Sequence, residues 1–453
     1  MRVAATPRDG LGHAKRMIAL AAALRGLGAQ ISAPDLLSPN ANPMIRSSAE
    51  SLGMVPSADD AECVVFDSYE LGAAEQEFEM ARGRVVVVVD DAPTRPHRCS
   101  LLLDQNSIDH QPHRFATLVP ENCRLLLGPA FALLGSEYQT DQRPRPAQVG
   151  PRRVVVNFGG SPQDALEMLA VEALNSAGVR PPEWEIVVAG ATPARPSMRD
   201  LWESATLVVG AAGSSSWERA RVGVRSVVVA IAANQEPVGM ALAAARVARY
   251  AGRVGDTSQI SLASAIRSAL DDDPEDVARR GWQLVDGLGA HRVARAVVTV
   301  MSPLKLREAT VNDGDLLYEL RNAPTVVASF LSGRSVSREE HEKWLHRQLE
   351  CRDLARIFVA QKGSTPAGFI RFDRLAAGDV WDLSYALADG LRGLGHGVPL
   401  VAAGISSLGD AGLRTVISAK VLTSNIPSLR TLRRVGFREV SRHGDVASLS
   451  LRV

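Results

Sequence analysis

Over residues 1–300, short runs of aliphatic residues alternate with longer stretches of helical character. Continuous aliphatic runs of this length are typical of strands that are buried on both faces of a parallel sheet. The alternation occurs twice, and it therefore predicts two successive α/β units. The runs expected to form strands are 63–67, 85–90, 100–105 and 124–128 in the first unit, and 154–160, 185–190, 205–210 and 226–231 in the second.

Residues 141–153, with the sequence DQRPRPAQVGPRR, separate these two units. A stretch so rich in proline, arginine and glycine indicates an interdomain linker. We therefore predict an N-terminal Rossmann-like lobe over 1–145 and a second, nucleotide-binding Rossmann-like lobe over 150–300, which ends in helices over 256–300. The two lobes are expected to face each other across a cleft, because ligands of such sheets bind beyond the carboxyl ends of the strands.

The character of the sequence changes after residue 303. Residues 306–322 are typical of a strand, a turn and a helix, and residues 356–375 are typical of a hairpin closed by KGSTPAG. A compact mixed α/β domain is therefore expected over 304–453.

Composition argues against several classes of function. The chain has 453 residues and a formal net charge of +1, so neither nucleic acid nor an acidic membrane surface is an expected partner. No apolar run reaches the roughly 20 residues of a membrane helix, and no signal segment opens the chain. The absence of a CxxC pair argues against a zinc site or a disulfide framework and predicts a protein of the reducing cytoplasm. The four cysteines are Cys63, Cys99, Cys123 and Cys351.

The segment RDGLGHAKRM, residues 8–17, lies between the expected first strand and a helical stretch. Its glycines, Gly10 and Gly12, would let the backbone pass close to a ligand. His13 follows them near the predicted helix N-terminus, where an imidazole could act as an acid or a base. A core or capping histidine is the alternative interpretation.

Another polar turn, GAAGSSSWER, follows the strand expected at 205–210. Gly213, Ser214 and Ser215 would form the start of a helix, where free backbone N–H groups and hydroxyls suit a diphosphate. Glu218, in the first helical turn, could accept hydrogen bonds from ribose hydroxyls. The same residues would equally suit a serine N-cap and an exposed glutamate.

Two more polar turns follow strands of the second lobe. NFGGSPQDA contains Gly160 and Ser161, and AANQE contains Asn234 and Gln235. Each could be an ordinary turn, but three polar turns after successive strands favour one shared ligand site. The two amide side chains are expected to contact the base or the sugar.

The blocks GLGHAKR, FDSYELG, VVVDDAPTRPHRCSLLLDQN, LLLGPAFALLGSEY, VVVNFGGSPQDA, VVGAAGSSSWER and ANQE follow one another in this order. In this order they resemble the UDP-sugar hydrolases of the pseudaminic-acid pathway, over nearly all of residues 1–300. The resemblance implies two lobes in the GT-B arrangement of glycosyltransferases. It also implies removal of UDP from UDP-2,4-diacetamido-2,4,6-trideoxy-β-L-altropyranose without a metal.

The resemblance also assigns residues. It implies that His13 is the general base that takes a proton from water, and that Asp67 and Tyr69 are catalytic-site residues in contact with the sugar. Asp90 and Asp91 also end a strand, and either could cap the next segment. The further residues predicted to bind the UDP-sugar are Gly12, Arg16 and Asn106, although Asn106, which closes a strand, could instead only form a turn.

In the last domain, RGLGHG at 392–397 lies between an expected strand and a helix. Consecutive backbone N–H groups in such a turn can bind a pyrophosphate. Together with NIPSLRTLRRVGF at 425–437, this turn resembles the GCN5-related N-acetyltransferases. The resemblance implies acetyl-CoA as co-substrate. The residues predicted to bind it are Leu387, Arg392, Gly393, Gly395, His396, Gly397, Asn425 and Ser428.

Residues 306–322 and 337–345 are similar to the acetyltransferase of the same pathway, which acetylates the 4-amino group of the UDP-sugar. Leu432 stands where many relatives have a tyrosine that protonates the CoA thiolate; Tyr385 or a water could substitute. His341 could deprotonate the amine, but we expect it on a solvated face beside Trp344. His396 is expected to fill its turn rather than to act in catalysis.

The sequence thus predicts an α/β protein with two Rossmann-like lobes and a GCN5-related N-acetyltransferase domain. Its expected function is bifunctional: 4-N-acetylation of a UDP-4-amino-4,6-dideoxy-N-acetyl-altrosamine, then hydrolysis to UDP and free sugar. The expected partners are the UDP-sugar and acetyl-CoA. The alternative is a GT-B UDP-sugar glycosyltransferase whose C-terminal module binds CoA without catalysis.

Overall fold

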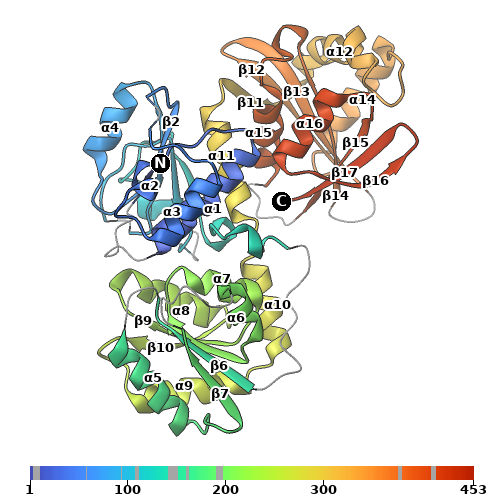
Figure 1. The fold of residues 1–453 in the computed structure, drawn as a ribbon. Coiled ribbons are helices and arrows are strands. Elements are labelled where there is room, and N and C mark those ends of the chain that lie inside the picture. The colour runs from blue at the N-terminus through green and yellow to red at the C-terminus, as the bar shows by residue number, and fades with distance from the viewer. Residues whose placement is uncertain are drawn as a thin grey trace. The chain divides into compact units, whose positions relative to one another are not determined.

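The computed structural model describes residues 1–3, 11–57, 59–92, 94–107, 112–140, 152–159, 163–189, 197–375, 380–409 and 415–453. The chain divides into two compact units, one made of residues 1–22 and 30–293 and the other of residues 23–29 and 294–453. The first unit contains two five-stranded sheets and the second contains one seven-stranded sheet (Figure 1). Among the helices in these ranges, none combines the length and the apolarity that a membrane span needs.

The first sheet is parallel throughout, and its strands follow one another in chain order. All four aliphatic runs predicted for this part of the chain are strands, each buried at its carboxyl end. Its strands are β1 (Arg2–Val3), β2 (Cys63–Asp67), β3 (Val85–Val89), β4 (Leu101–Asp104) and β5 (Arg124–Leu127), and its helices are α1 (Gly12–Gly26), α2 (Pro34–Leu37), α3 (Pro43–Ser51) and α4 (Ala73–Ala81).

β1 is an edge strand of this sheet and pairs with β2. The segment around Ser32 lies next to the start of β1, because the Ser32 carbonyl accepts a hydrogen bond from the Met1 ammonium at 2.5 Å. Ser32 also forms an isolated parallel bridge with Val55. Ligands of open parallel sheets bind beyond the carboxyl ends of the strands.

The second sheet is also parallel and has the order β10-β9-β8-β6-β7. β6 lies between β7 and β8, so the strand order of this sheet reverses at β6, and ligands of such sheets bind at this switch point. The four predicted runs of this lobe are strands, whereas β10 was not predicted. The strands are β6 (Arg152–Asn157), β7 (Trp184–Val188), β8 (Leu207–Ala211), β9 (Ser226–Ala230) and β10 (Arg249–Arg253).

Alternate residues of this sheet pack on opposite layers of helices. Val154 and Val156 belong to the core under α5 (Asp164–Ser176) and α9 (Gln259–Asp271). Val155 belongs to the core on the other face. That face is covered by α6 (Met198–Ser204), α7 (Ser215–Val222) and α8 (Glu236–Ala244).

The helices predicted over 256–300 are confirmed as α9, α10 (Pro274–Leu284) and α11 (Gly289–Met301). Most of the predicted linker lies outside the described residues, and its last two residues already belong to β6. Six short 3-10 helices complete the described elements. They are η1 (Pro112–Phe115), η2 (Pro129–Phe131), η3 (Ser136–Tyr138), η4 (Ala233–Gln235), η5 (Val311–Asp313) and η6 (Asp389–Leu391).

The second unit is built on a mixed sheet in the order β11-β12-β13-β14-β15-β17-β16. All neighbours are antiparallel except β14 and β15, which are parallel. The predicted hairpin is confirmed as β12 and β13. The strands are β11 (Leu304–Glu308), β12 (Ala355–Lys362), β13 (Thr365–Arg374), β14 (Val380–Leu387), β15 (Val416–Leu422), β16 (Arg438–His443) and β17 (Val446–Arg452).

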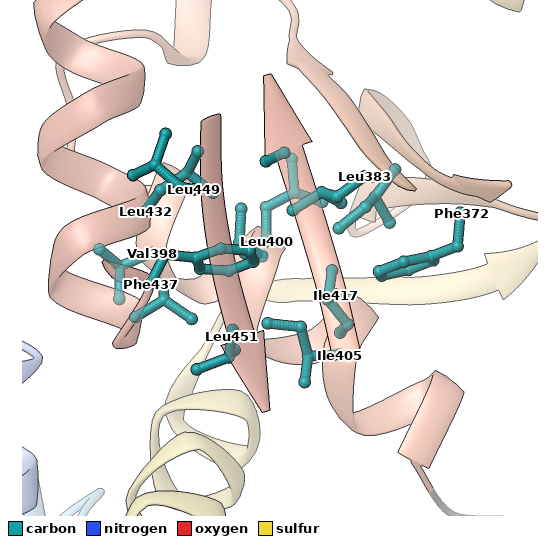
Figure 2. Close-up of a cluster of buried hydrophobic side chains, with 14 of the residues drawn as sticks. Phe372, Leu383, Val398, Leu400, Ile405, Ile417, Leu432, Phe437, Leu449 and Leu451 are labelled. Atoms are coloured by element: carbon teal, nitrogen blue, oxygen red, sulfur yellow. The ribbon is translucent and has the colours of Figure 1, made fainter. Parts of the chain in front are cut away.

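Helices pack on both faces of this sheet. α12 (Gly314–Asn322), α13 (Pro324–Val327) and α14 (Arg338–Glu350) share a core with one face. α15 (Gly397–Gly409) and α16 (Ile426–Val435) share a core with the other. Figure 2 shows this second core, where Leu400 and Leu432 lie among side chains from the strands. Both leucines have no exposed surface, so the two helices are held firmly against the sheet.

Candidate active sites

In the first unit, acidic side chains gather at the carboxyl ends of three neighbouring parallel strands. Asp67 ends β2, Asp90 directly follows β3, and Asp104 ends β4. All three are buried. His13 lies in the first turn of α1, as the sequence predicts. In the described ranges, no three His, Cys, Asp or Glu side chains are arranged to hold a metal ion.

His13 is held by a buried carboxylate. Its Nδ1 lies 2.6 Å from Asp67 Oδ1, and Asp67 has no exposed surface. Burial alone would raise the pKa of Asp67, but Arg16 and His13 hold that pKa below its ordinary value, so the carboxyl is ionised. Arg16 Nη2 also lies 3.0 Å from Nδ1. In the tautomer whose Nδ1–H donates to the ionised Asp67, Nε2 carries the lone pair that can accept a proton. No hydrogen bond of Nε2 is found within the described part of the chain.

Arg16 and Asp67, both predicted to be site residues, form a buried ion pair behind His13. Arg16 Nε donates to Asp67 Oδ2 at 2.7 Å, and its Nη2 donates to Oδ1. Arg16 lies one helical turn after His13, so both side chains leave α1 on the same face. Only 6% of Arg16 and 0% of Asp67 is exposed, and the predicted contacts of both residues with the sugar stay predictions. They neutralise each other behind the imidazole.

Tyr69 borders His13 from another side. The two rings meet edge to face, with centroids 5.1 Å apart and planes at 88°. The Tyr69 hydroxyl donates to Asp91 Oδ1 at 2.5 Å and accepts from Asn234 Nδ2 at 3.1 Å. Burial of the hydroxyl and the neighbouring Asp91 raise the pKa of Tyr69. Tyr69 is therefore a neutral phenol at ordinary pH.

The serine turn of the second sheet lies close to the start of α1. A Cβ placed on Gly12 would lie 3.2 Å from Ser214 Oγ, and one on Gly213 would lie 3.2 Å from Gln235 Nε2. Gln235 Oε1 accepts from the Ile231 backbone N–H at 3.2 Å. Four residues predicted to bind UDP-sugar, Gly12, Gly213, Ser214 and Gln235, are thus neighbours. Gly160 and Ser161, also predicted, lie outside the described residues.

Further along α7, two residues predicted to bind the UDP-sugar form hydrogen bonds with other protein side chains. Ser215 Oγ accepts from Arg219 Nη1 at 3.2 Å, and Glu218 Oε2 accepts from Trp202 Nε1 at 3.1 Å. Arg219 is fully buried, and this burial lowers its pKa to about 10. The start of α7 therefore carries a buried cation beneath it. A positive charge in this place favours an anion at the helix N-terminus.

Two residues of the site carry no sequence prediction as ligands. Asp91 accepts from Asn106 Nδ2 at 2.6 Å as well as from Tyr69, and Trp217 Nε1 donates to Asn106 Oδ1 at 2.9 Å. Both ends of the Asn106 amide are thus bonded within the protein, and its predicted contact with the UDP-sugar stays a prediction. The only feature of the sequence that pointed to Asp91 as a site residue was its position directly after a strand. No feature of the sequence pointed to Trp217.

In the second unit, the predicted acetyl-CoA residues surround one turn. Gly393 and Gly395 have φ of 76° and 83°, a conformation that strongly favours glycine. Arg392 Nε donates to the Leu387 carbonyl at 3.0 Å and thereby ties the turn to the end of β14. The turn leads through His396 into α15, which begins at Gly397.

α16 begins beside this turn. A Cβ on Gly397 would lie 2.9 Å from Thr431 Oγ1, so the start of α15 contacts α16. Asn425 caps α16, because its Oδ1 accepts from the Ser428 N–H at 3.2 Å. The structure therefore brings together the two segments that the sequence predicted to bind acetyl-CoA.

β14 and β15 separate next to these segments. Their parallel pairing covers only Val380–Asp382 of β14 and Val416–Ser418 of β15, although both strands continue beyond. In the separated part of β14, Tyr385 places its hydroxyl 3.0 Å from Ser428 Oγ. Burial raises the pKa of Tyr385, so its phenol keeps its proton. We call the separated ends of β14 and β15 the strand gap.

The predicted solvent exposure of His341 is wrong. Only 4% of the residue is exposed, and its Nε2 lies 3.0 Å from the Gly314 carbonyl. Its ring lies 5.5 Å from the rings of both Tyr318 and Trp344. Burial lowers the pKa of His341, so the imidazole is neutral. The cause is the packing of this face of α14 against α12.

Comparison with known proteins identifies the second unit. Residues 304–438 match the family model described as an acetyltransferase (GNAT) domain. None of the curated proteins compared matches the sequence.

Three solved structures illustrate the similarity. A domain from Methanocaldococcus jannaschii has 20% identity and a TM-score of 0.30, over 33% of this chain and 98% of that one. Spermidine N-acetyltransferase from Vibrio cholerae, solved with CoA and spermine, has 18% sequence identity and a TM-score of 0.30. The similarity covers 33% of this chain and 95% of that one. A Salmonella typhimurium acetyltransferase that modifies the N-terminal serine of ribosomal protein L7/L12 has 19% sequence identity and a TM-score of 0.30. The similarity covers 33% of this chain and 95% of that one.

The family match confirms the acetyltransferase that the sequence predicted for the last domain, together with its co-substrate, acetyl-CoA. Residues 304–438 are a GNAT acetyltransferase domain.

Proposed function

We propose that the chain catalyses two consecutive reactions on a nucleotide sugar. The GNAT domain acetylates the 4-amino group of a UDP-4-amino-4,6-dideoxy-N-acetyl-altrosamine. The first unit then hydrolyses the resulting UDP-2,4-diacetamido-2,4,6-trideoxy-β-L-altropyranose to UDP and free sugar. The observation that carries the second step is His13, with Nδ1 on a buried carboxylate and Nε2 unbonded in the described structure, next to the serine turn of α7.

In the first reaction, the sugar amine attacks the acetyl carbonyl of acetyl-CoA, the carbon–sulfur bond breaks, and CoA leaves as a thiol. The backbone groups of the strand gap suit the amides of the pantetheine arm, since they lack a neighbouring strand there. The turn at Gly393 and Gly395 suits the pyrophosphate. Tyr385 is the proton donor to the departing sulfur, because Leu432 lies in the core and carries no hydroxyl.

In the second reaction, water attacks the anomeric carbon of the sugar. His13 Nε2 takes a proton from this water, and Asp67 stabilises the imidazolium that forms. The bond between the anomeric carbon and the diphosphate oxygen breaks. The start of α7, with Ser214 and the buried Arg219, supports the negative charge of the departing UDP.

The test uses the full chain, acetyl-CoA and the UDP-4-amino sugar. We expect mass spectrometry to find the free 2,4-diacetamido sugar, with one thiol and one UDP released per sugar. UDP release that requires an added acceptor sugar would instead identify a glycosyltransferase. No UDP release with either addition would refute the proposed second step. The matched control, His13→Ala, should stop after acetylation.

A further inference from the structure

Asp91 has no role in the reactions described so far, although both of its carboxylate oxygens are bonded. Its neighbour Asp90 is fully occupied by local contacts. Asp90 accepts from the Ala92 N–H at 2.8 Å and from Arg95 Nε at 2.9 Å, and it lies 3.1 Å from His97 Nε2. These contacts fix the turn after β3. The fixed turn leaves Asp91 facing the residues around His13.

A continuous chain of hydrogen bonds passes through Asp91. On one side, Asp91 Oδ1 accepts from the Tyr69 hydroxyl, which accepts from Asn234. On the other side, Asp91 Oδ2 accepts from Asn106, which accepts from Trp217. Trp217 belongs to α7, and Asn234 to η4. The two ends of the chain are thus the two elements proposed to hold the nucleotide.

Tyr69 transmits the effect of Asp91 to the proposed base. Its ring meets the His13 ring edge to face at 5.1 Å, on a side of the imidazole that Asp67 does not hold. Asp91 and Asn234 fix the hydroxyl at the far end of the Tyr69 ring. A ring fixed at its hydroxyl is restrained from moving away from the imidazole. Loss of these bonds would remove this restraint on His13, which Asp67 would still hold at Nδ1.

We propose that Asp91 is a positioning residue for the His13 base, that it acts through Tyr69, and that the chain from Trp217 to Asn234 links this base to the nucleotide-holding elements. The proposal rests on the proposed hydrolysis of a UDP-sugar. Asp91 does not contact His13 and is given no proton to move. Its contribution is to keep Nε2 in line with the attacking water.

The first test observes the His13 ring without any substrate. The full chain carries ¹³C-labelled histidine, and His13→Ala assigns the resonances of His13 among the nine histidines. We expect Asp91→Ala and Tyr69→Phe to move the His13 ring resonances in the same direction. The control is Glu70→Gln, which removes an exposed negative charge next to Tyr69 and should leave the resonances in place. Asp91→Ala with unchanged His13 resonances would overturn the proposal.

The second test separates positioning from binding. In UDP release, Asp91→Ala should lower kcat about 10- to 100-fold, because a displacement of a catalytic group by about 1 Å lowers the rate by about this factor. KM should change less than about twofold if binding energy is untouched. The double variant with Tyr69→Phe should be no slower than the slower single variant. A raised KM with wild-type kcat would assign Asp91 to binding and refute the proposal.

Two outcomes remain distinct. If the wild-type chain releases no UDP, the proposed hydrolysis fails, while the resonance experiment still decides whether Asp91 acts on His13. If Asp91→Ala does not fold, Asp91→Asn replaces it. The asparagine keeps one acceptor oxygen, so it should move the His13 resonances in the same direction by a smaller amount.

Discussion

His13 Nδ1 lies 2.6 Å from Oδ1 of the fully buried Asp67. The two residues come from different elements, α1 and β2, and Arg16 completes the charge balance of the pair. Asp67 thereby fixes the orientation of the imidazole through Nδ1, and Nε2 is the nitrogen proposed to act as the base.

His13→Ala should abolish UDP release and leave acetyl transfer intact. Loss of a general base typically lowers a rate about 10²- to 10⁴-fold. The measurement is UDP and thiol release from the same reaction. Because the acetyl-CoA residues belong to the other unit, loss of both activities would contradict the two-site proposal.

Asp67→Asn should destabilise the first unit by about 3–5 kcal/mol, the usual cost of breaking a buried ion pair. The reason is that Arg16 would remain buried without its anion. The control is Glu50→Gln, which breaks the exposed Arg46–Glu50 pair and should cost less than about 1 kcal/mol. Urea unfolding measures both. Equal effects of the two variants would contradict the role given to Asp67.

Asp104 should make the first unit less stable as pH rises. Burial raises the pKa of Asp104 to about 7, whereas an unfolded aspartate has a pKa of about 3.9. Between these values the folded state holds a proton that the unfolded state has lost. The free energy of unfolding therefore falls as pH rises through this range, by up to about 4 kcal/mol in total. The carboxyls of Asp67 and Asp90, whose pKa values are lowered, lose their contribution only in more acidic solution.

Asp104→Asn should flatten this dependence, since the amide cannot titrate and can still accept the hydrogen bond from the Asn106 N–H. Denaturant unfolding at about pH 5 and about pH 8 measures how far the free energy of unfolding falls between these pH values. By the linkage relation, this fall should be smaller in the variant than in the wild type. A variant with the same decline as the wild type would show that another group titrates.

Tyr385→Phe should slow acetyl transfer without weakening acetyl-CoA binding. The phenol that lies 3.0 Å from Ser428 would be lost, while the ring would still pack against the core. We expect kcat for thiol release to fall about 10²-fold, as for other general acids. Tyr318→Phe, on the opposite face of the sheet, is the control. An unchanged kcat would leave protonation of the thiolate to water.

Most of the fold could be predicted from the sequence, because strands buried on both faces must be continuously apolar. VVVVV and LLLD formed strands as predicted. β10, with the sequence RYAGR, was missed because it lies at the edge of its sheet and is partly exposed along its length. An edge strand needs no apolar run, so nothing in its composition distinguishes it from a loop.

The site was harder to predict, because its contacts join residues far apart in the chain. Arg16 and Asp67 are separated by 51 residues, and Trp217 and Asn106 by 111. A buried ion pair and two ligand-binding side chains look alike in a sequence, so nothing predicted that Arg16 and Asp67 pair with each other. His341 was predicted to be exposed for a related reason. Its helix is strongly charged, yet His341 and Leu345 point from one face into the core.

The limited pairing of β14 and β15 has a mechanical consequence for the second unit. Within the described residues, three residue pairs join β11–β14 to the strands that follow. The seven-stranded sheet therefore behaves as two narrower sheets that are joined by a few hydrogen bonds. A bound molecule whose amides form hydrogen bonds with both strands in the strand gap would make the whole sheet more rigid. The co-substrate would then serve as a structural part of the enzyme as well as a reagent.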